Sequence, residues 1–219
     1  MNSSLRIALV ANTLALIAGS GSALAGASAA GKNQQDGKSS VTVHILRNAE
    51  VPIPTLFLAE AVAREMFAKA GVNLKLQTRK PKLDAVGQKI VVDITSGGPK
   101  FLHRAALAYA EEFEGVHITV FYDRVKDAAC GSASEFVGPC AGSSLPMLLA
   151  HVLVHEITHI LEGIDRHSRE GVMKAHWTTG DIAGMARKPL PFDRSDIELI
   201  RSGLARRETA RKVTVALGR

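Results

Sequence analysis

The stretch from Met147 to Leu161, with the sequence MLLAHVLVHEITHIL, constrains the fold of this chain more than any other stretch. It is rich in apolar residues, has the length of a helix and contains neither glycine nor proline, so it predicts a buried helix. Pro146, which follows Gly-Ser-Ser at 142–144, gives a start signal, and Gly163 gives a stop signal. The polar residues within this stretch are therefore expected on a helix of the core.

Three of these polar residues form a metal-binding pattern. His155 and His159 are four residues apart, and residues with that spacing lie one above the other on one helix face. Their imidazole nitrogens can reach one ion at the roughly 2.0–2.1 Å that Zn²⁺ requires. Glu156 lies one step round the helix, where it can take a proton from a metal-bound water. The pattern predicts a metallohydrolase, most naturally a peptidase. A core helix that carries these residues by chance is the alternative, but burial of an unpaired Glu156 would be costly.

A third protein ligand must come from beyond this helix, because catalytic zinc usually takes three and leaves one position for water. His167 is the ligand that we expect, since it follows the Gly163 break by four residues and the chain can turn back under the ion. Asp165 is nearer in sequence, and Glu198 would serve in a gluzincin-type peptidase, where a second helix supplies a glutamate. His176 is a weaker alternative, and a surface loop is the alternative position for His167.

The segment HEITHILEGIDRHSREGVMKAHW resembles the active-site stretch of the metzincins, a group of zinc peptidases. Their pattern is His-Glu-x-x-His-x-x-Gly-x-x-His, followed by a methionine turn beneath the metal. In this chain Gly163 stands one residue later and His167 two residues later than in that pattern. Asp165 consequently stands where the snapalysin branch of the group has an aspartate as its third ligand.

The closer resemblance is to small exported bacterial proteins of metzincin type, which have the form His-Glu-Ile-x-His-x-Leu-x-Gly-x-x-x-His-Ser-x-x-Gly-x-Met-x-Ala-x-Trp. The residues after the helix that fit this form without a gap are His167, Ser168, Gly171, Met173, Ala175 and Trp177. The resemblance extends over most of residues 41–200. It implies an α/β (α+β) metzincin-like zincin domain, with a mixed twisted sheet, a metal-binding helix and a small C-terminal helical part.

The same resemblance implies a set of roles for individual residues. One Zn²⁺ ion would be held by His155, His159 and His167, with Glu156 as the general base. Met173 would provide an apolar floor without binding the metal. The expected activity is zinc-dependent hydrolysis of a peptide or protein substrate by an endopeptidase. A metal-stabilised binding protein that retains the site without turnover is the alternative from another functional class.

The N-terminus has the composition of an export signal. Ile7 to Ala18 is an apolar run too short to span a bilayer, and the small-residue sequence Ala23-Leu24-Ala25 follows it. We expect cleavage after Ala25 and a periplasmic or secreted product without a stable membrane anchor; an uncleaved anchor is the alternative. Residues 26–40 are expected to form a disordered leader. A single metallopeptidase-like domain then occupies 41–219, with an upper part up to 163 and a lower part from 164, as the length and 46% hydrophobic content allow.

Export makes the two cysteines interpretable. Cys130 and Cys140 flank a loop that contains glycine and serine and directly precedes the predicted metal helix. In an oxidising compartment a local disulfide between them is expected. A thiolate that caps the metal and two free thiols are the alternatives.

The charge of the chain is moderately basic, with 27 Lys and Arg against 21 Asp and Glu. The basic residues are densest at 79–82 and 201–212. A solvated face explains this excess, and attraction to anionic envelope surfaces or acidic substrates is the alternative. No aromatic residues are interleaved in the basic runs, so a nucleic-acid stacking platform is not indicated. The sequence does not indicate an oligomeric state.

Apolar patterning places the remaining elements. Strands are expected at 41–46, 72–77, 89–94 and 116–121, helices at 56–70 and 193–205, and a loop or short helix at 101–108. If the fold is metzincin-like, residues 116–122 are a candidate edge strand for an extended peptide, with an ordinary sheet member as the alternative.

Two residues near the predicted site have open roles. Trp177, with residues 178–180, is either the wall of a specificity pocket or part of the core. His151 lies one turn before His155, and it either supports the site by hydrogen bonding or is a satisfied core histidine.

Overall fold

The computed structural model describes residues 39–78, 89–98, 106–111, 116–130 and 144–217. The predicted signal peptide, the leader up to residue 38, the basic run at 79–82 and Cys140 all lie outside these ranges. Of the predicted disulfide only Cys130 is described, so the bridge stays a prediction. The elements are β1 (Ser39–Arg47), α1 (Ile53–Lys69), β2 (Val72–Gln77), β3 (Ile90–Thr95), β4 (Ala108–Glu111), β5 (His117–Phe121), α2 (Tyr122–Cys130), α3 (Ser144–Glu162), α4 (Thr179–Met185) and α5 (Arg194–Leu217).

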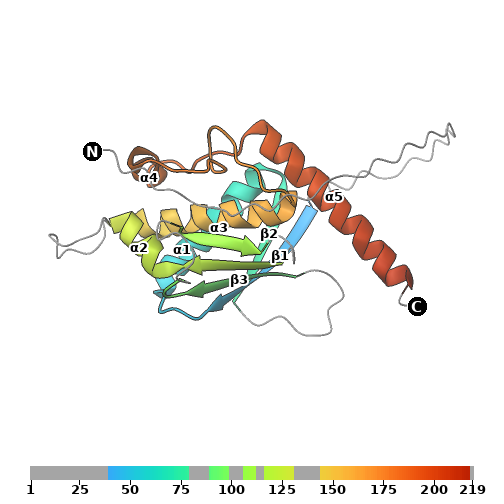
Figure 1. Ribbon diagram of the computed structural model, residues 1–219, viewed down its shortest axis with the longest axis horizontal. Coiled ribbons are helices and arrows are strands. Elements are labelled where there is room, and N and C mark those ends of the chain that lie inside the picture. The colour runs from blue at the N-terminus through green and yellow to red at the C-terminus, as the bar shows by residue number, and fades with distance from the viewer. Residues whose placement is uncertain (1–38, 79–88, 99–105, 112–115, 131–143, 218–219) are drawn as a thin grey trace.

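The described strands form one five-stranded mixed sheet in the order β2-β1-β3-β5-β4 (Figure 1). β1 is parallel to β2 and to β3, β3 is parallel to β5, and β4 is antiparallel to β5. Apolar residues meet across the central pairs, with Val43 opposite Ile90 and Val92 opposite Ile118. A parallel sheet of this kind needs an apolar cover on its faces, because its strands are near-continuous apolar runs.

Helices α1 and α3 provide such a cover and pack against each other, α1 against β2 and α3 against β4 and β5. In α1 the buried apolar residues recur every three or four positions, at Leu56, Ala59, Ala63 and Phe67. Helix α3 is almost wholly buried, including its histidines and glutamates. It is long and apolar enough to cross a bilayer, but 83% of that apolar window is buried inside the fold, as in a core helix.

Most predicted strands and helices are found within a few residues of their expected limits. The last helix is the exception, because α5 continues to Leu217 where an end at 205 was expected, and three short elements were missed. β4 begins inside the segment expected to be a loop or short helix, α2 directly follows β5, and α4 follows Trp177. The edge-strand hypothesis for 116–122 is wrong, because β5 is paired on both sides, with β3 and β4. The edge beside α3 is β4, which is too short and too rich in alanine to give an alternating pattern.

Candidate metal centre

Helix α3 and the loop that follows it bring three imidazole rings together. One nitrogen from each of His155, His159 and His167 lies within 4.8 Å of the other two. The Nε2 atoms of His155 and His159 are 3.1 Å apart. Two ligands at about 2.0–2.1 Å from a tetrahedral ion would be about 3.3–3.4 Å apart, so this spacing nearly matches a shared zinc ion. Among the described residues, these three form the group that could hold a metal ion.

The electrostatics of the cluster favour neutral imidazoles, which are the form that binds metals. Burial lowers the pKa of His155 well below its usual value, and the neighbouring His159 lowers it further. Burial also lowers the pKa of His159, to about 4, and His167 adds to the shift. The pKa of His167 is lowered too, again mainly by burial. At neutral pH all three rings therefore keep a lone pair available for a cation.

The polar atoms of the cluster fit a metal better than they fit the protein alone. The Nε2 atom of His167 is buried and has no hydrogen-bond partner among the described residues. Such an unpartnered atom costs free energy unless a ligand satisfies it. Three convergent nitrogens, with the buried carboxylate of Glu156 next to His155 in the sequence, match the donor set that catalytic zinc sites use when they leave a fourth position open.

The turn at residues 171–173 contacts the histidine cluster through a hydrogen bond with His155. The Nδ1 atom of His155 lies 2.9 Å from the Val172 carbonyl oxygen, which can only accept, so the ring proton sits on Nδ1 and Nε2 faces the other histidines. The side chain of Met173 is fully buried, as expected for a structural role. Gly171 has a φ of 77°, and a Cβ there would overlap the Pro191 carbonyl oxygen, so glycine is required.

The C-terminal end of α3 is held by α5. Gly163 ends α3 in the left-handed region at φ 66°. Arg206 donates to the Glu162 carbonyl at 2.6 Å, and Arg207 donates to the Ile160 carbonyl at 3.1 Å. Two cations thus satisfy terminal carbonyls of α3 and oppose the negative end of its dipole. Gly203 of α5 also packs closely on α3, so closely that a Cβ at this position would overlap the Leu161 carbonyl.

His151 and Trp177 are both core residues. The Leu190 N–H donates to His151 Nε2 at 2.9 Å, so His151 Nδ1 carries the proton and donates to the Met147 carbonyl at 2.7 Å. His151 is therefore the satisfied core histidine of the two predicted possibilities. Trp177 is fully buried, with its ring edge-on to His155 at 5.5 Å, which agrees with the core interpretation rather than with an exposed pocket wall.

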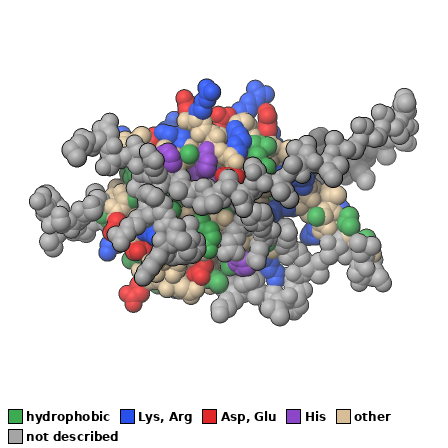
Figure 2. Space-filling view, in the orientation of Figure 1, with side chains coloured by type: hydrophobic (Ala, Val, Ile, Leu, Met, Phe, Trp, Pro, Cys, Tyr) green, Lys and Arg blue, Asp and Glu red, His purple; other side chains and the backbone are tan. Residues whose placement is uncertain are grey.

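The alternative third ligands lie outside the cluster. Asp165 and His176 are exposed, and neither belongs to the group of converging ligand atoms. Glu198 is an exposed residue of α5, where it pairs with Arg194 at 3.3 Å. His167 is only half-buried, and Figure 2 shows histidine side chains at the surface among lysine and arginine side chains.

Sequence reasoning missed the residues that anchor the third histidine. Arg166 and Ser168 both bind Asp196, which lies in the first turn of α5. The spacing of 28 to 30 residues carries no local pattern. The sequence Asp-Arg-Ser-Asp at 193–196 is typical of a helix N-terminus, so capping alone explains its polar residues and no distant partner is indicated.

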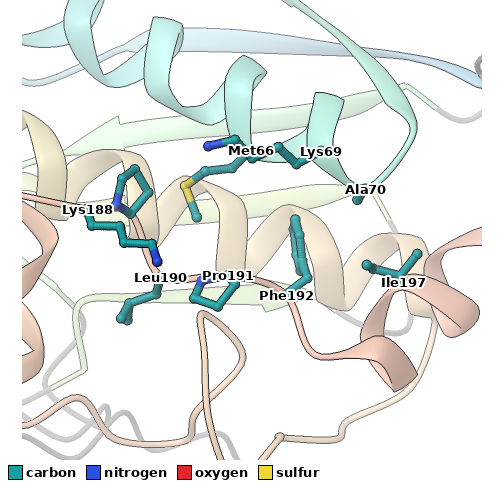
Figure 3. Close-up of a pocket in the computed structure, with 9 residues that line it drawn as sticks. Met66, Lys69, Ala70, Lys188, Leu190, Pro191, Phe192 and Ile197 are labelled. Atoms are coloured by element: carbon teal, nitrogen blue, oxygen red, sulfur yellow. The ribbon is translucent and has the colours of Figure 1, made fainter.

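A separate pocket of about 260 Å³ lies between the end of α1 and residues 188–192 (Figure 3). Met66, Leu190 and Phe192 give it an apolar lining, and Lys69 and Lys188 also line it. None of the three histidines lines it. One lining residue is linked to the metal centre: the Pro191 carbonyl accepts a hydrogen bond at 2.9 Å from the N–H of Val172, whose own carbonyl contacts His155.

The comparisons with known proteins agree in fold. No family model and no curated protein sequence matches the chain. A zinc-dependent peptidase from Methanocorpusculum labreanum superposes with a TM-score of 0.52 and 14% identity, over 72% of this chain and 99% of the other. Archaemetzincin from Methanopyrus kandleri gives a TM-score of 0.48 and 17% identity, over 79% and 98%. The first of these likenesses shows that the chain shares its mixed α/β fold with a solved structure.

Proposed function

We propose that this chain is a zinc-dependent peptidase in which His155, His159 and His167 bind the metal. The observation that carries the proposal is the convergence of three buried or half-buried imidazoles within 4.8 Å of one another beside a buried glutamate. The fold shared with a protein described as a zinc-dependent peptidase supports it. So does the unpartnered Nε2 of His167, which a metal would satisfy.

The metal and the residues around it would have separate roles in the proposed reaction. When bound, zinc would lower the pKa of the attacking water and polarise the substrate carbonyl. Glu156 follows His155 directly in α3, and its side chain is only 1% exposed. There it accepts the proton of the attacking water and returns it to the leaving amine. The Val172 carbonyl keeps His155 in the tautomer that leaves Nε2 free for the metal.

The substrate would bind as an extended chain along β4. This strand lies at an edge of the described sheet, is antiparallel to β5 and contacts α3. A strand at the edge of a sheet can offer main-chain hydrogen bonds to a peptide of any sequence. We therefore propose that the chain is an endopeptidase. The export signal expected at residues 1–25 would place it in the periplasm or outside the cell.

The test is the substitution Glu156→Gln, compared with Glu170→Gln at an exposed position of the following loop. We expect wild-type protein to bind one zinc ion, to cut peptides from a broad library and to lose this activity reversibly on chelation. Glu156→Gln should retain zinc and lose hydrolysis by about 10²- to 10⁴-fold, because only the general base is removed. Glu170→Gln should behave as wild type.

Each rival predicts a different result. Wild-type protein that binds zinc stoichiometrically and cuts no member of the library would favour the metal-stabilised binding protein. Loss of zinc in Glu198→Ala but not in His167→Ala would favour the gluzincin-type arrangement. A fully active Glu156→Gln variant would remove Glu156 from the mechanism.

A further inference from the structure

One carboxylate oxygen of α5 binds both residues that flank His167. Asp196 is fully buried, and its Oδ1 accepts from Ser168 Oγ at 2.5 Å and from Arg166 Nη1 at 3.0 Å. The other guanidinium nitrogen of Arg166 donates to Ser195 Oγ at 2.6 Å. The segment on either side of His167 is thus fixed to the first turn of α5 by charge-assisted hydrogen bonds.

Helix capping does not account for this arrangement. The Oδ2 atom of Asp196 accepts from the Asp193 N–H at 2.8 Å, which is the usual task of an acidic residue at this position. Capping needs only that oxygen. Both contacts of Oδ1 go instead to the loop near the metal centre.

The loop depends on these contacts because it has little other structure. After Gly163 the chain runs without helix or strand to an isolated bridge between Ser168 and Lys174. The Ser168 N–H donates to the Met173 carbonyl at 2.8 Å, so the backbone of Ser168 is tied to the turn and its side chain to α5. His167 lies between Ser168 and Arg166, the other residue that binds Asp196.

We propose that Asp196 is a positioning residue. Its hydrogen bonds to Ser168 and Arg166 hold His167 in the position needed to bind the metal. The inference rests on the proposed function in one respect, namely that His167 binds zinc. Ligand atoms must be held within about 0.5 Å of their productive positions, and partners outside the ligand set commonly provide this. Here the support acts on the backbone beside the ligand instead of on its ring.

The test compares Ser168→Ala with Ser202→Ala. Both substitutions delete one hydroxyl, but Ser202 is exposed on α5 and donates only to the Glu198 carbonyl. Zinc affinity is measured by competition with a chelator, and the Co²⁺-substituted protein reports the coordination number through its visible absorption. We expect Ser168→Ala to weaken zinc about 10- to 100-fold and to change the Co²⁺ spectrum. The melting temperature of the metal-free protein should fall by no more than about 4 °C.

Asp196→Ala and the double variant provide a second test. Because the hydroxyl and the carboxylate act through the same bond, adding Ser168→Ala to Asp196→Ala should cost no further zinc affinity. Should Asp196→Ala fail to fold, Ser168→Ala alone decides. Wild-type affinity and an unchanged Co²⁺ spectrum in Ser168→Ala would overturn the inference, and so would fully additive losses in the double variant.

His167→Ala separates this inference from the proposed function. If His167→Ala binds zinc as tightly as wild type, the proposed ligand set fails and the positioning role fails with it. If His167→Ala loses zinc while Ser168→Ala binds it normally, the positioning role alone fails.

Discussion

Glu162, the last residue of α3, provides a quantitative test of the structure that does not depend on catalysis. Its side chain is fully buried, and neither carboxylate oxygen has a hydrogen-bond partner among the described residues. Its pKa is raised from 4.5 to about 7, mainly by burial and also by the nearby Asp196, while Arg166 acts in the opposite direction. The folded protein therefore prefers this carboxyl group in its neutral form.

The sign and size of the effect follow from linkage. Because the pKa is higher in the folded state, the favourable contribution is complete below about pH 4.5 and is lost as the pH rises through about 7. A shift from 4.5 to about 7 corresponds to a loss of about 3 kcal/mol in unfolding free energy. Glu162→Gln keeps the shape and cannot ionise. The free energy of unfolding of the variant minus that of wild type should therefore grow by about 2.5 kcal/mol between about pH 5 and pH 8.

Urea unfolding of both proteins in the presence of chelator measures this difference. Subtraction of the wild-type curve removes the contribution of the histidines, whose lowered pKa values destabilise the metal-free protein as the pH falls. Glu198→Gln on the exposed face of α5 is the matched control and should give a flat difference. A flat difference for Glu162→Gln, or one that falls with pH, would show that this carboxylate is ionised and paired in the folded state.

Two further substitutions test the supports of α3. Gly203→Ala places a Cβ against the Leu161 carbonyl and should lower the free energy of urea unfolding by at least about 2 kcal/mol, whereas tolerance of alanine would mean that α5 does not pack on α3 as described. His151→Phe leaves the part-buried backbone N–H of Leu190 unpaired and should cost about 1 kcal/mol or more of stability. Zinc affinity in His151→Phe should stay within about two-fold of wild type, since this ring is not a ligand; a larger loss would assign it to the site.

The part of the site that the sequence could predict is the part built on local patterns. The uninterrupted apolar run around His155 and His159 predicts a buried helix, and the four-residue spacing then fixes both rings on one face. His167 is predicted as a ligand by a resemblance and by its distance from Gly163. The structure brings it to the other two histidines, but no local rule dictates that the loop must turn in that direction.

The remaining features depend on contacts between distant residues. The position of β5 inside the sheet is set by its pairing with β4, whose four residues are too few to be recognised as a strand from their pattern. The contact between Ser168 and Asp196 joins two polar residues of ordinary appearance. Trp177 could not be assigned to core or surface from its neighbours, because its burial is decided by α3 and the loop around it.

Compared with the metzincin pattern that the sequence resembles, this chain has two more residues between His159 and His167, and the contacts with Asp196 lie on this longer connection. One of them lies before Gly163, so α3 continues to Glu162, and the Gly163 N–H still bonds the His159 carbonyl at 2.8 Å. The other lengthens the segment between Gly163 and His167. Ordering one more residue costs about 1–2 kcal/mol of backbone entropy, which a longer loop must recover through contacts. The hydrogen bonds to Asp196 from either side of His167 are the contacts available to recover it, and they connect the geometry of the centre to the packing of the last helix.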